Sequence, residues 1–231
     1  ATSAQVVFKI LTTNKKEIFV SSPSLWPDVS QIQEMQEPWV KIELLTPNFY
    51  FNQIFKVLTN FKVLLKETKS ITTNKLIILA EAPLRTIISG SFYDCLKGST
   101  QGYASFSFQQ LGFRKADLVK LDILIAGWNE EAFSRIVSKE ESFSEGKKII
   151  QKLKTILPSQ QFAVSLQAAI GGKIIARETI RALRKDVTAP LYGGDITRKR
   201  KLLDIQKKGK KELMAKGKIN IPARVFLEML K

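Results

Sequence analysis

Two periodicities of hydrophobic residues alternate between residues 38 and 112. Runs in which every second residue is apolar predict strands with one buried face, and apolar residues spaced three and four positions apart predict helices. In order, the predicted elements are a strand at 40–44, a helix at 51–58, strands at 61–65 and 76–80, a helix at 84–95 and a strand at 104–108. This β-α-β-β-α-β order predicts a ferredoxin-like domain over residues 38–112.

Two local signals refine this domain. Thr46 followed by Pro47 predicts the N-cap and first position of the first helix. Cys95 lies on the apolar stripe of the second helix with Leu84 and Phe92, so we expect a core residue and not a nucleophile. Because it is the only cysteine, the chain has no internal disulfide, which is typical of a reducing compartment.

Residues 1–37 carry a weaker pattern. Two β-branched and aromatic runs, residues 6–10 and 17–20, flank a polar stretch and predict a hairpin, after which serines and prolines interrupt regular structure. We therefore expect residues 1–37 to be a connector with a β-hairpin. The first residues show neither an initiator Met nor a signal-peptide pattern and lead into a strand-like run, so we expect a fragment of a longer chain.

A second domain is expected over residues 113–231. Its predicted elements are a strand at 119–125, a short run at 132–137, a helix at 149–156, a strand at 162–168, a turn at Gly171-Gly172, and helices at 178–187 and 196–213. The predicted fold class is therefore α+β, with a ferredoxin-like domain followed by a second, basic α+β domain that carries a long C-terminal helix.

Charge separates the two halves of the chain. The 231 residues contain 37 Lys and Arg against 21 Asp and Glu, a net charge of +16. Residues 1–112 carry 11 basic and 8 acidic side chains, whereas residues 113–231 carry 26 and 13. The second half therefore holds nearly all the excess, which indicates a polyanionic partner: nucleic acid, or with less support an anionic membrane surface.

The cations of the second half fall into two predicted helices. Arg177, Arg181 and Arg184 recur at i, i+4 and i+7, which places them on one flank of the helix at 178–187. The helix at 196–213 follows Gly193-Gly194, is capped by Asp195, and has a narrow apolar stripe of Leu202, Ile205 and Leu213. The predicted RNA-binding residues are Arg177, Arg181, Arg184, Lys185, Tyr192, Gly193, Gly194, Arg198, Lys199, Arg200, Lys201, Lys207, Lys208, Lys210 and Lys211. For the two glycines, a structural turn and a close approach of backbone to RNA are the alternatives.

Several classes of function are disfavoured by the composition. The chain has no histidine, which removes the usual catalytic triads and the commonest metal ligand. Neither of the two glycine-rich loop patterns that cradle nucleotide phosphates occurs, and the paired glutamates at 130–131 and 140–141 lie in polar loops. We expect no catalytic residue, metal or cofactor in this chain, and no segment long enough to span a bilayer.

Longer motifs carry a family resemblance. Residues 167–171, 174–179, 183–187 and 192–199, with Leu202-Leu203, Gly209-Lys210-Lys211 and residues 219–222, resemble the C-terminal domain of the LepA family, translational GTPases also called elongation factor 4. Residues 37–40, Thr46-Pro47 and residues 99–105 resemble the domain that this family shares with elongation factor G, its domain V.

The resemblance implies a ribosome-bound factor. It implies contacts of the basic residues with tRNA or large-subunit ribosomal RNA and proteins, and GTP-dependent back-translocation or rescue of stalled ribosomes by the parent protein. GTP and magnesium would belong to a G domain that this chain lacks, so we expect no enzyme activity in this fragment. The expected location is cytoplasmic and ribosome-associated, and the alternatives are a location peripheral to the inner membrane and an organellar parent.

Two further expectations concern partners. We expect a monomer, and peripheral association with an anionic membrane remains an alternative. A general structured-RNA-binding module or a basic membrane-surface module is the alternative function.

Overall fold

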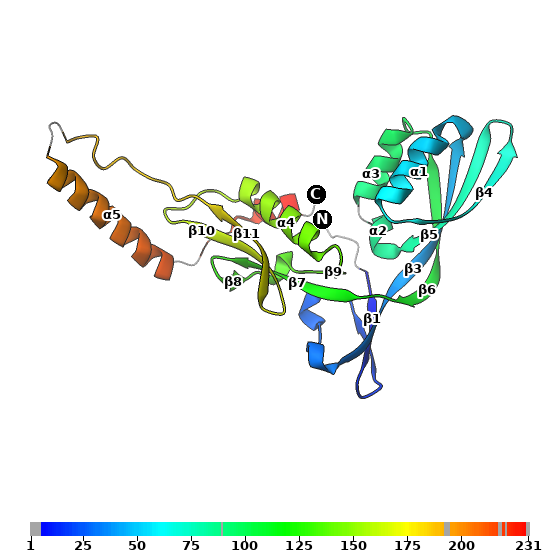
Figure 1. The fold of residues 1–231 in the computed structure, drawn as a ribbon, viewed down its shortest axis with the longest axis horizontal. Coiled ribbons are helices and arrows are strands. Elements are labelled where there is room, and N and C mark those ends of the chain that lie inside the picture. Colours follow the sequence, from blue (N-terminus) through cyan, green and yellow to red (C-terminus); the bar gives the residue numbers. More distant parts are fainter. Residues whose placement is uncertain (1–5, 89, 192–194, 217–218, 220, 230–231) are drawn as a thin grey trace. The chain divides into compact units, whose positions relative to one another are not determined.

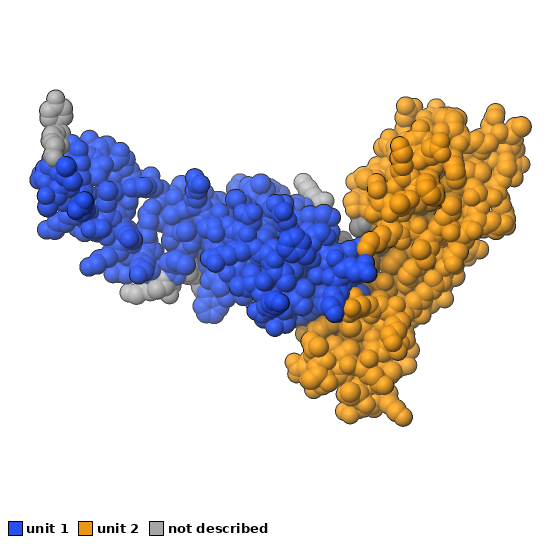
Figure 2. Space-filling view, in the orientation of Figure 1, with its two compact units in different colours: residues 1–3, 118–231 blue, residues 4–117 orange. Residues whose placement is uncertain are grey.

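The structure, a computed structural model, describes residues 6–88, 90–191, 195–216, 219 and 221–229. The contacts divide the chain into two compact units (Figure 2). Unit 2 ends at Asp117 and unit 1 continues from Leu118, so the division lies near the predicted boundary between residues 112 and 113.

The four-stranded part of unit 2 is organised around its long strand β3. Its strands are β3 (Ile32–Pro47), β4 (Leu64–Thr72), β5 (Lys75–Pro83) and β6 (Ser105–Lys115). They are antiparallel in the order β6-β3-β5-β4, with β5 in a central position. The helices α1 (Phe51–Asn60), α2 (Leu84–Ile88) and α3 (Gly90–Ser99) complete the predicted β-α-β-β-α-β order (Figure 1).

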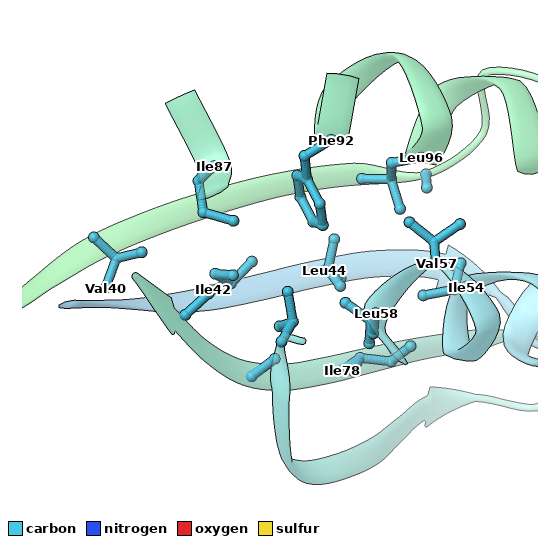
Figure 3. Close-up of a cluster of buried hydrophobic side chains, with 14 of the residues drawn as sticks. Val40, Ile42, Leu44, Ile54, Val57, Leu58, Ile78, Ile87, Phe92 and Leu96 are labelled. Carbon is cyan, nitrogen blue, oxygen red and sulfur yellow. The ribbon is translucent and has the colours of Figure 1, made fainter. Parts of the chain in front are cut away.

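The core of unit 2 lies between this sheet and its helices. Alternate residues of β3, such as Ile42 and Leu44, face Ile54 of α1 and Phe92 of α3, and all four are fully buried (Figure 3). Burial of each such side chain contributes about 1.5–3 kcal/mol to folding. The ferredoxin-like prediction is thus confirmed at the level of elements and fold class.

Two local predictions for this unit are wrong. Thr46 and Pro47 do not start the helix; they end β3, where Pro47 lies opposite Lys75, and a 3₁₀ turn at Asn48–Tyr50 separates them from α1. Cys95 is exposed, because α3 turns the row of Phe92 and Leu96 toward the sheet and leaves Cys95 on the next row. The apolar spacing identified the helix, but its phase was misassigned.

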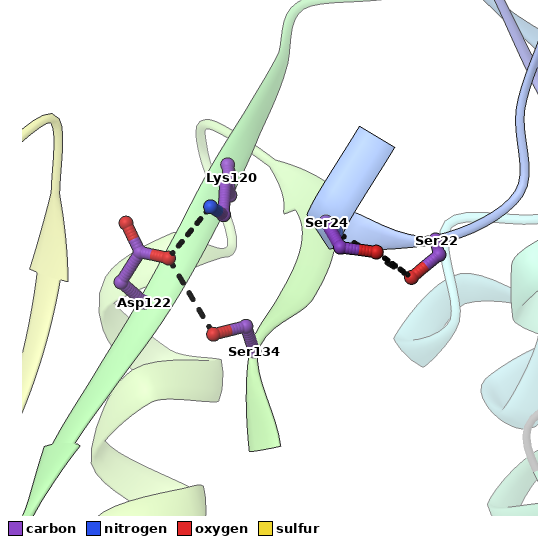
Figure 4. A network of polar contacts seen from close by, with 5 residues as sticks. All are labelled: Ser22, Ser24, Lys120, Asp122 and Ser134. Carbon is purple, nitrogen blue, oxygen red and sulfur yellow. Dashed lines mark hydrogen bonds and ion pairs between the residues drawn. The ribbon is translucent and has the colours of Figure 1, made fainter. Parts of the chain in front are cut away.

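The residues predicted as a connector form part of the same sheet. β1 (Phe8–Thr12) and β2 (Glu17–Val20) make the predicted hairpin, and β1 pairs with the first half of β3. Phe8, Ile10 and Val20 are buried, so the hairpin has its own apolar face. After it, Ser22 caps a 3₁₀ turn and its hydroxyl contacts that of Ser24 at 2.8 Å (Figure 4).

Unit 1 is a second antiparallel sheet with a helix on one face. Its elements are β7 (Leu118–Ile125), β8 (Trp128–Asn129), β9 (Arg135–Ser138), α4 (Ser142–Ile156), β10 (Val164–Ile170), β11 (Lys173–Ile180), α5 (Ile196–Lys216) and α6 (Ala223–Met229). The strand order is β11-β10-β7-β8, with β9 also paired to β7. Asp122 of β7 accepts a hydrogen bond from Ser134 and pairs with Lys120 (Figure 4).

Helices α4 and α6 close the core of unit 1. Leu153 of α4 is fully buried against the sheet, and Val225 of α6 is fully buried in the same cluster. Phe226 of α6 stacks on Phe133 with ring centroids 5.0 Å apart. The chain therefore returns to this core after α5.

The helix predicted at residues 178–187 does not form. Instead β11 runs through Ile180, in register with β10 from Val164 to Ile170, and residues 181–186 have neither helical nor strand structure. The hairpin turn at Gly171-Gly172, where both glycines have positive φ, brings β11 alongside β10 and supplies the ladder hydrogen bonds. Sheet pairing overrides the three-to-four-residue apolar spacing of this segment.

Candidate nucleic-acid interface

Arg177 lies on β11 and not on a helix. Its neighbour Glu178 accepts a 2.8 Å hydrogen bond from Lys154 of α4, so Glu178 is on the face of the sheet that α4 covers. Because successive side chains of a strand point to opposite faces, Arg177 projects from the open face, where it is exposed. The Lys154 hydrogen bond also lowers the pKa of the Glu178 carboxyl.

The other cations of the predicted helical row follow β11 in an extended segment. Arg181, Arg184 and Lys185 are all exposed there. The segment ends in a turn in which the Asp186 carboxylate accepts hydrogen bonds from the backbone N–H groups of Thr188 and Ala189 and from the Thr188 hydroxyl. The Thr188 hydroxyl bond is the main cause of a lowered Asp186 pKa. The predicted row of guanidinium groups one helical turn apart is therefore wrong, although its residues remain on the surface.

The long basic helix is present as α5, and its predicted N-cap is confirmed. Asp195 Oδ1 accepts a 3.1 Å hydrogen bond from the backbone N–H of Arg198. This bond satisfies one of the donors that every helix start leaves free. The helix therefore begins where the sequence predicts, and it extends to Lys216.

Two side chains of α5 hold the extended segment through its backbone. Gln206 Nε2 donates to the carbonyl of Lys185 at 2.8 Å, and Lys210 Nζ donates to the carbonyl of Leu183 at 2.7 Å. The two donors are four helical residues apart, a rise of about 6.0 Å. The two acceptor carbonyls are two extended residues apart, a span of about 6.6 Å, so the spacing of the donors matches that of the acceptors. We call this pair of contacts the latch. It aligns α5 antiparallel to the segment that carries Arg181 and Arg184.

The apolar stripe of α5 is rotated from its predicted position. Ile205 and Leu213 are 58% and 44% exposed, whereas Leu202 and Leu203 are half-buried. Leu203 lines a shallow depression together with Arg184, Lys185, Asp186, Val187 and Thr188. The residues of α5 that contact or face the extended segment are thus Leu203, Gln206 and Lys210.

The outward side of α5 is a row of cations. The exposed members are Arg198, Arg200, Lys201, Lys207, Lys208 and Lys211, while Lys199 and Lys210 are half-buried. Within residues 195–216, no ion pair joins one of these cations to a carboxylate. Arg181, Arg184 and Lys185 likewise have no carboxylate ion pair in the described part of the chain. Two adjacent segments therefore present cations that form no ion pair, although the charge of Arg184 contributes to lowering the pKa of the neighbouring Asp186 carboxyl.

Comparison with known proteins identifies both units. Residues 125–231 match the family described as the GTP-binding protein LepA C-terminus, and residues 34–124 match the elongation factor G C-terminus. The chain is therefore similar to the LepA family over residues 125–231. The resemblance predicted from the sequence motifs is thereby confirmed.

Several curated LepA relatives, named elongation factor 4, align with the whole chain. Identity is 44% over 230 residues for the Clostridium tetani protein, and 43% for those of Acetivibrio thermocellus and Chlamydia trachomatis. The chain spans 38% of the length of each of these relatives and corresponds to the C-terminal domains. A solved structure from Thermus thermophilus aligns over 36% of this chain and 12% of its own at 17% identity and a TM-score of 0.33, too weak to argue from.

For this LepA-type chain, the structure does not describe every predicted site residue. Tyr192, Gly193 and Gly194 lie outside the described residues. In the described ranges, no three His, Cys, Asp or Glu side chains gather as metal ligands, and no helix is long and apolar enough to cross a membrane. The latch was missed by sequence reasoning because Gln206 and Lys210 carry no signal that distinguishes them from solvated side chains.

Proposed function

We propose that this chain is the RNA-binding C-terminal part of a LepA-type translation factor, and that it contacts tRNA and ribosomal RNA through α5 and the extended segment beside it. The observation that carries the proposal is the unneutralised row of cations on α5, held alongside Arg181 and Arg184 by the latch. The family match supports a role in translation.

The mechanism is electrostatic and geometric. Cations facing a phosphate backbone release its condensed counterions, which makes binding favourable and dependent on salt. The row on α5 contains no aromatic side chain that could stack on a base. It therefore recognises the phosphate spacing and the shape of an RNA helix, as expected for structured RNA. Binding also relieves the repulsion among these like charges.

In this proposal the chain supplies binding and no catalysis. GTP hydrolysis and its magnesium belong to the G domain of the parent protein, and back-translocation or rescue of stalled ribosomes is the activity that these domains would serve. Ribosome association places the parent in the cytoplasm or in an equivalent organellar compartment.

The test is a salt series of tRNA binding with two matched triple variants. In the first, Arg200, Lys201 and Lys208 are replaced by Gln; in the control, the exposed Lys15, Lys16 and Lys56 of unit 2 are replaced by Gln. Each cation that faces a phosphate contributes about 0.7–0.9 to the slope of log K against log salt. We expect the first variant to lower the slope by this amount for every such cation replaced, and the control to keep the slope of the parent chain.

Equal slopes for the two variants would refute the proposal. Vesicles with anionic lipid serve as a second ligand in the same salt series. Tighter binding to these vesicles than to tRNA would favour a membrane-surface module instead.

A further inference from the structure

A cluster of aromatic rings stands at one end of unit 2. The Tyr50 ring contacts those of Phe49 and Tyr103, with ring centroids 4.2 Å and 6.0 Å away, and its plane is 26° from that of Tyr103. Tyr50 is 7% exposed, whereas Phe49 and Tyr103 are 69% and 65% exposed. Two large rings are therefore held outward against a buried one.

The cluster is fixed by its surroundings. The Tyr50 hydroxyl donates to Gln101 Oε1 at 3.1 Å, which ties the start of α1 to the turn that precedes Tyr103. Gln101 and Gly102 both have positive φ in that turn, and the Gly102 carbonyl accepts a hydrogen bond from Lys97. Exposed rings on such a defined backbone lose little conformational freedom when they bind a ligand.

The polar groups around the rings favour a nucleic-acid base. Three loops meet at this end, because Asn48 bonds to Thr73 and Asn74, and Tyr50 bonds to Gln101. Residues 46–50, 72–75 and 99–104, which form these loops, contain no acidic residue. Lys97 brings positive charge to this turn: its ammonium group donates to the Gly102 carbonyl and lies 5.8 Å from the centroid of the Tyr93 ring. Aromatic faces, amides and ammonium groups without carboxylates suit an unpaired base and its phosphate.

We infer that the exposed rings of Phe49 and Tyr103 offer a stacking platform for an unpaired base of RNA, with Lys97 supplying positive charge for the adjoining phosphates. This inference rests on the proposed RNA-binding function. It adds a second site, which binds an unstacked base, whereas the cations of α5 bind the backbone of an RNA helix. Tyr50 and Tyr103 already stack with their planes 26° apart, and a base would stack on the exposed ring in the same way.

The experiment uses the full 231-residue chain and two RNA probes. One is a hairpin with a single unpaired 2-aminopurine in its loop, and the other is a blunt duplex with no unpaired base. We expect Tyr103→Ala and Phe49→Ala each to weaken hairpin binding about 5- to 100-fold and to remove the change in 2-aminopurine emission, and to leave duplex binding unchanged. Tyr103→Phe keeps the stacking face and retains both signals.

Two controls separate this inference from the proposed function. Phe55→Ala removes a ring of unit 2 that is 48% exposed and lies outside the cluster, and it leaves hairpin binding unchanged. The triple α5 variant weakens binding of both probes but retains the emission change at saturation. Hairpin binding by Tyr103→Ala equal to that of the parent chain would overturn the inference, and would point to a protein partner for these rings.

Discussion

Helices α4 and α5 belong to the same unit and are held in opposite ways. In α4, Gly146, Ile149, Ile150 and Leu153 are buried, and Gly146 lies so close to the sheet that an added Cβ would meet the Ala168 Cβ at 3.0 Å. In α5 every side chain whose burial is described is exposed or half-buried. One helix is therefore fixed by packing, and the other by two side-chain bonds to a neighbouring backbone. The comparison shows why α5 can leave its cations unpaired: only a narrow stripe of its surface is half-buried, and the rest stays exposed.

The largest effect should come from truncating a side chain of α4. Leu153→Ala leaves a cavity at a fully buried position and should lower the free energy of unfolding by about 2–5 kcal/mol. Ile205→Ala on α5 removes a side chain that is 58% exposed and should change it by no more than about 0.5 kcal/mol. Urea denaturation measures both, and similar losses would show that α5 is packed after all.

A smaller and local effect is expected from the latch. Lys210→Met removes the donor to the Leu183 carbonyl, and a hydrogen bond contributes about 1 kcal/mol, so amide exchange in α5 should quicken about fivefold. The neighbouring Lys211→Met removes the same charge from an exposed position and should leave exchange unchanged. Equal exchange in the two variants would rule out the latch as the contact that positions α5.

The smallest effect concerns acidification of the turn at Asp186. The pKa of Asp186 is lower in the folded chain than in the unfolded chain, where it is about 3.9. The carboxylate therefore stabilises the fold fully above about pH 3.9, and this stabilisation is lost as the pH falls through the folded pKa. The amide signals of Thr188 and Ala189 should therefore move together below about pH 3.9 in an NMR titration. Asp186→Asn keeps an oxygen acceptor and should remove this step. A midpoint above about 3.9 would contradict the assigned hydrogen bonds.

The sequence predicted most of the fold where periodicity and burial agree. β3, β5, β7 and α4 were recognised because their apolar positions repeat with the period of the element that they form. The N-cap of α5 was recognised because Asp195 satisfies a backbone donor locally. The helix expected at residues 178–187 was wrong because its spacing also suited a strand, and only the partner β10 decides between the two.

The candidate site shows the same division. From the sequence alone came the family, the excess of cations in the second half, and the residues that carry it, since composition and motif are properties of the chain. Only the tertiary structure decided that Arg177 projects from a sheet, that Arg181 and Arg184 lie on an extended segment, and that Gln206 and Lys210 bind backbone carbonyls. The physical reason is range: caps and periodicities act between residues a few positions apart, whereas strand pairing and the latch join residues whose approach depends on the whole fold.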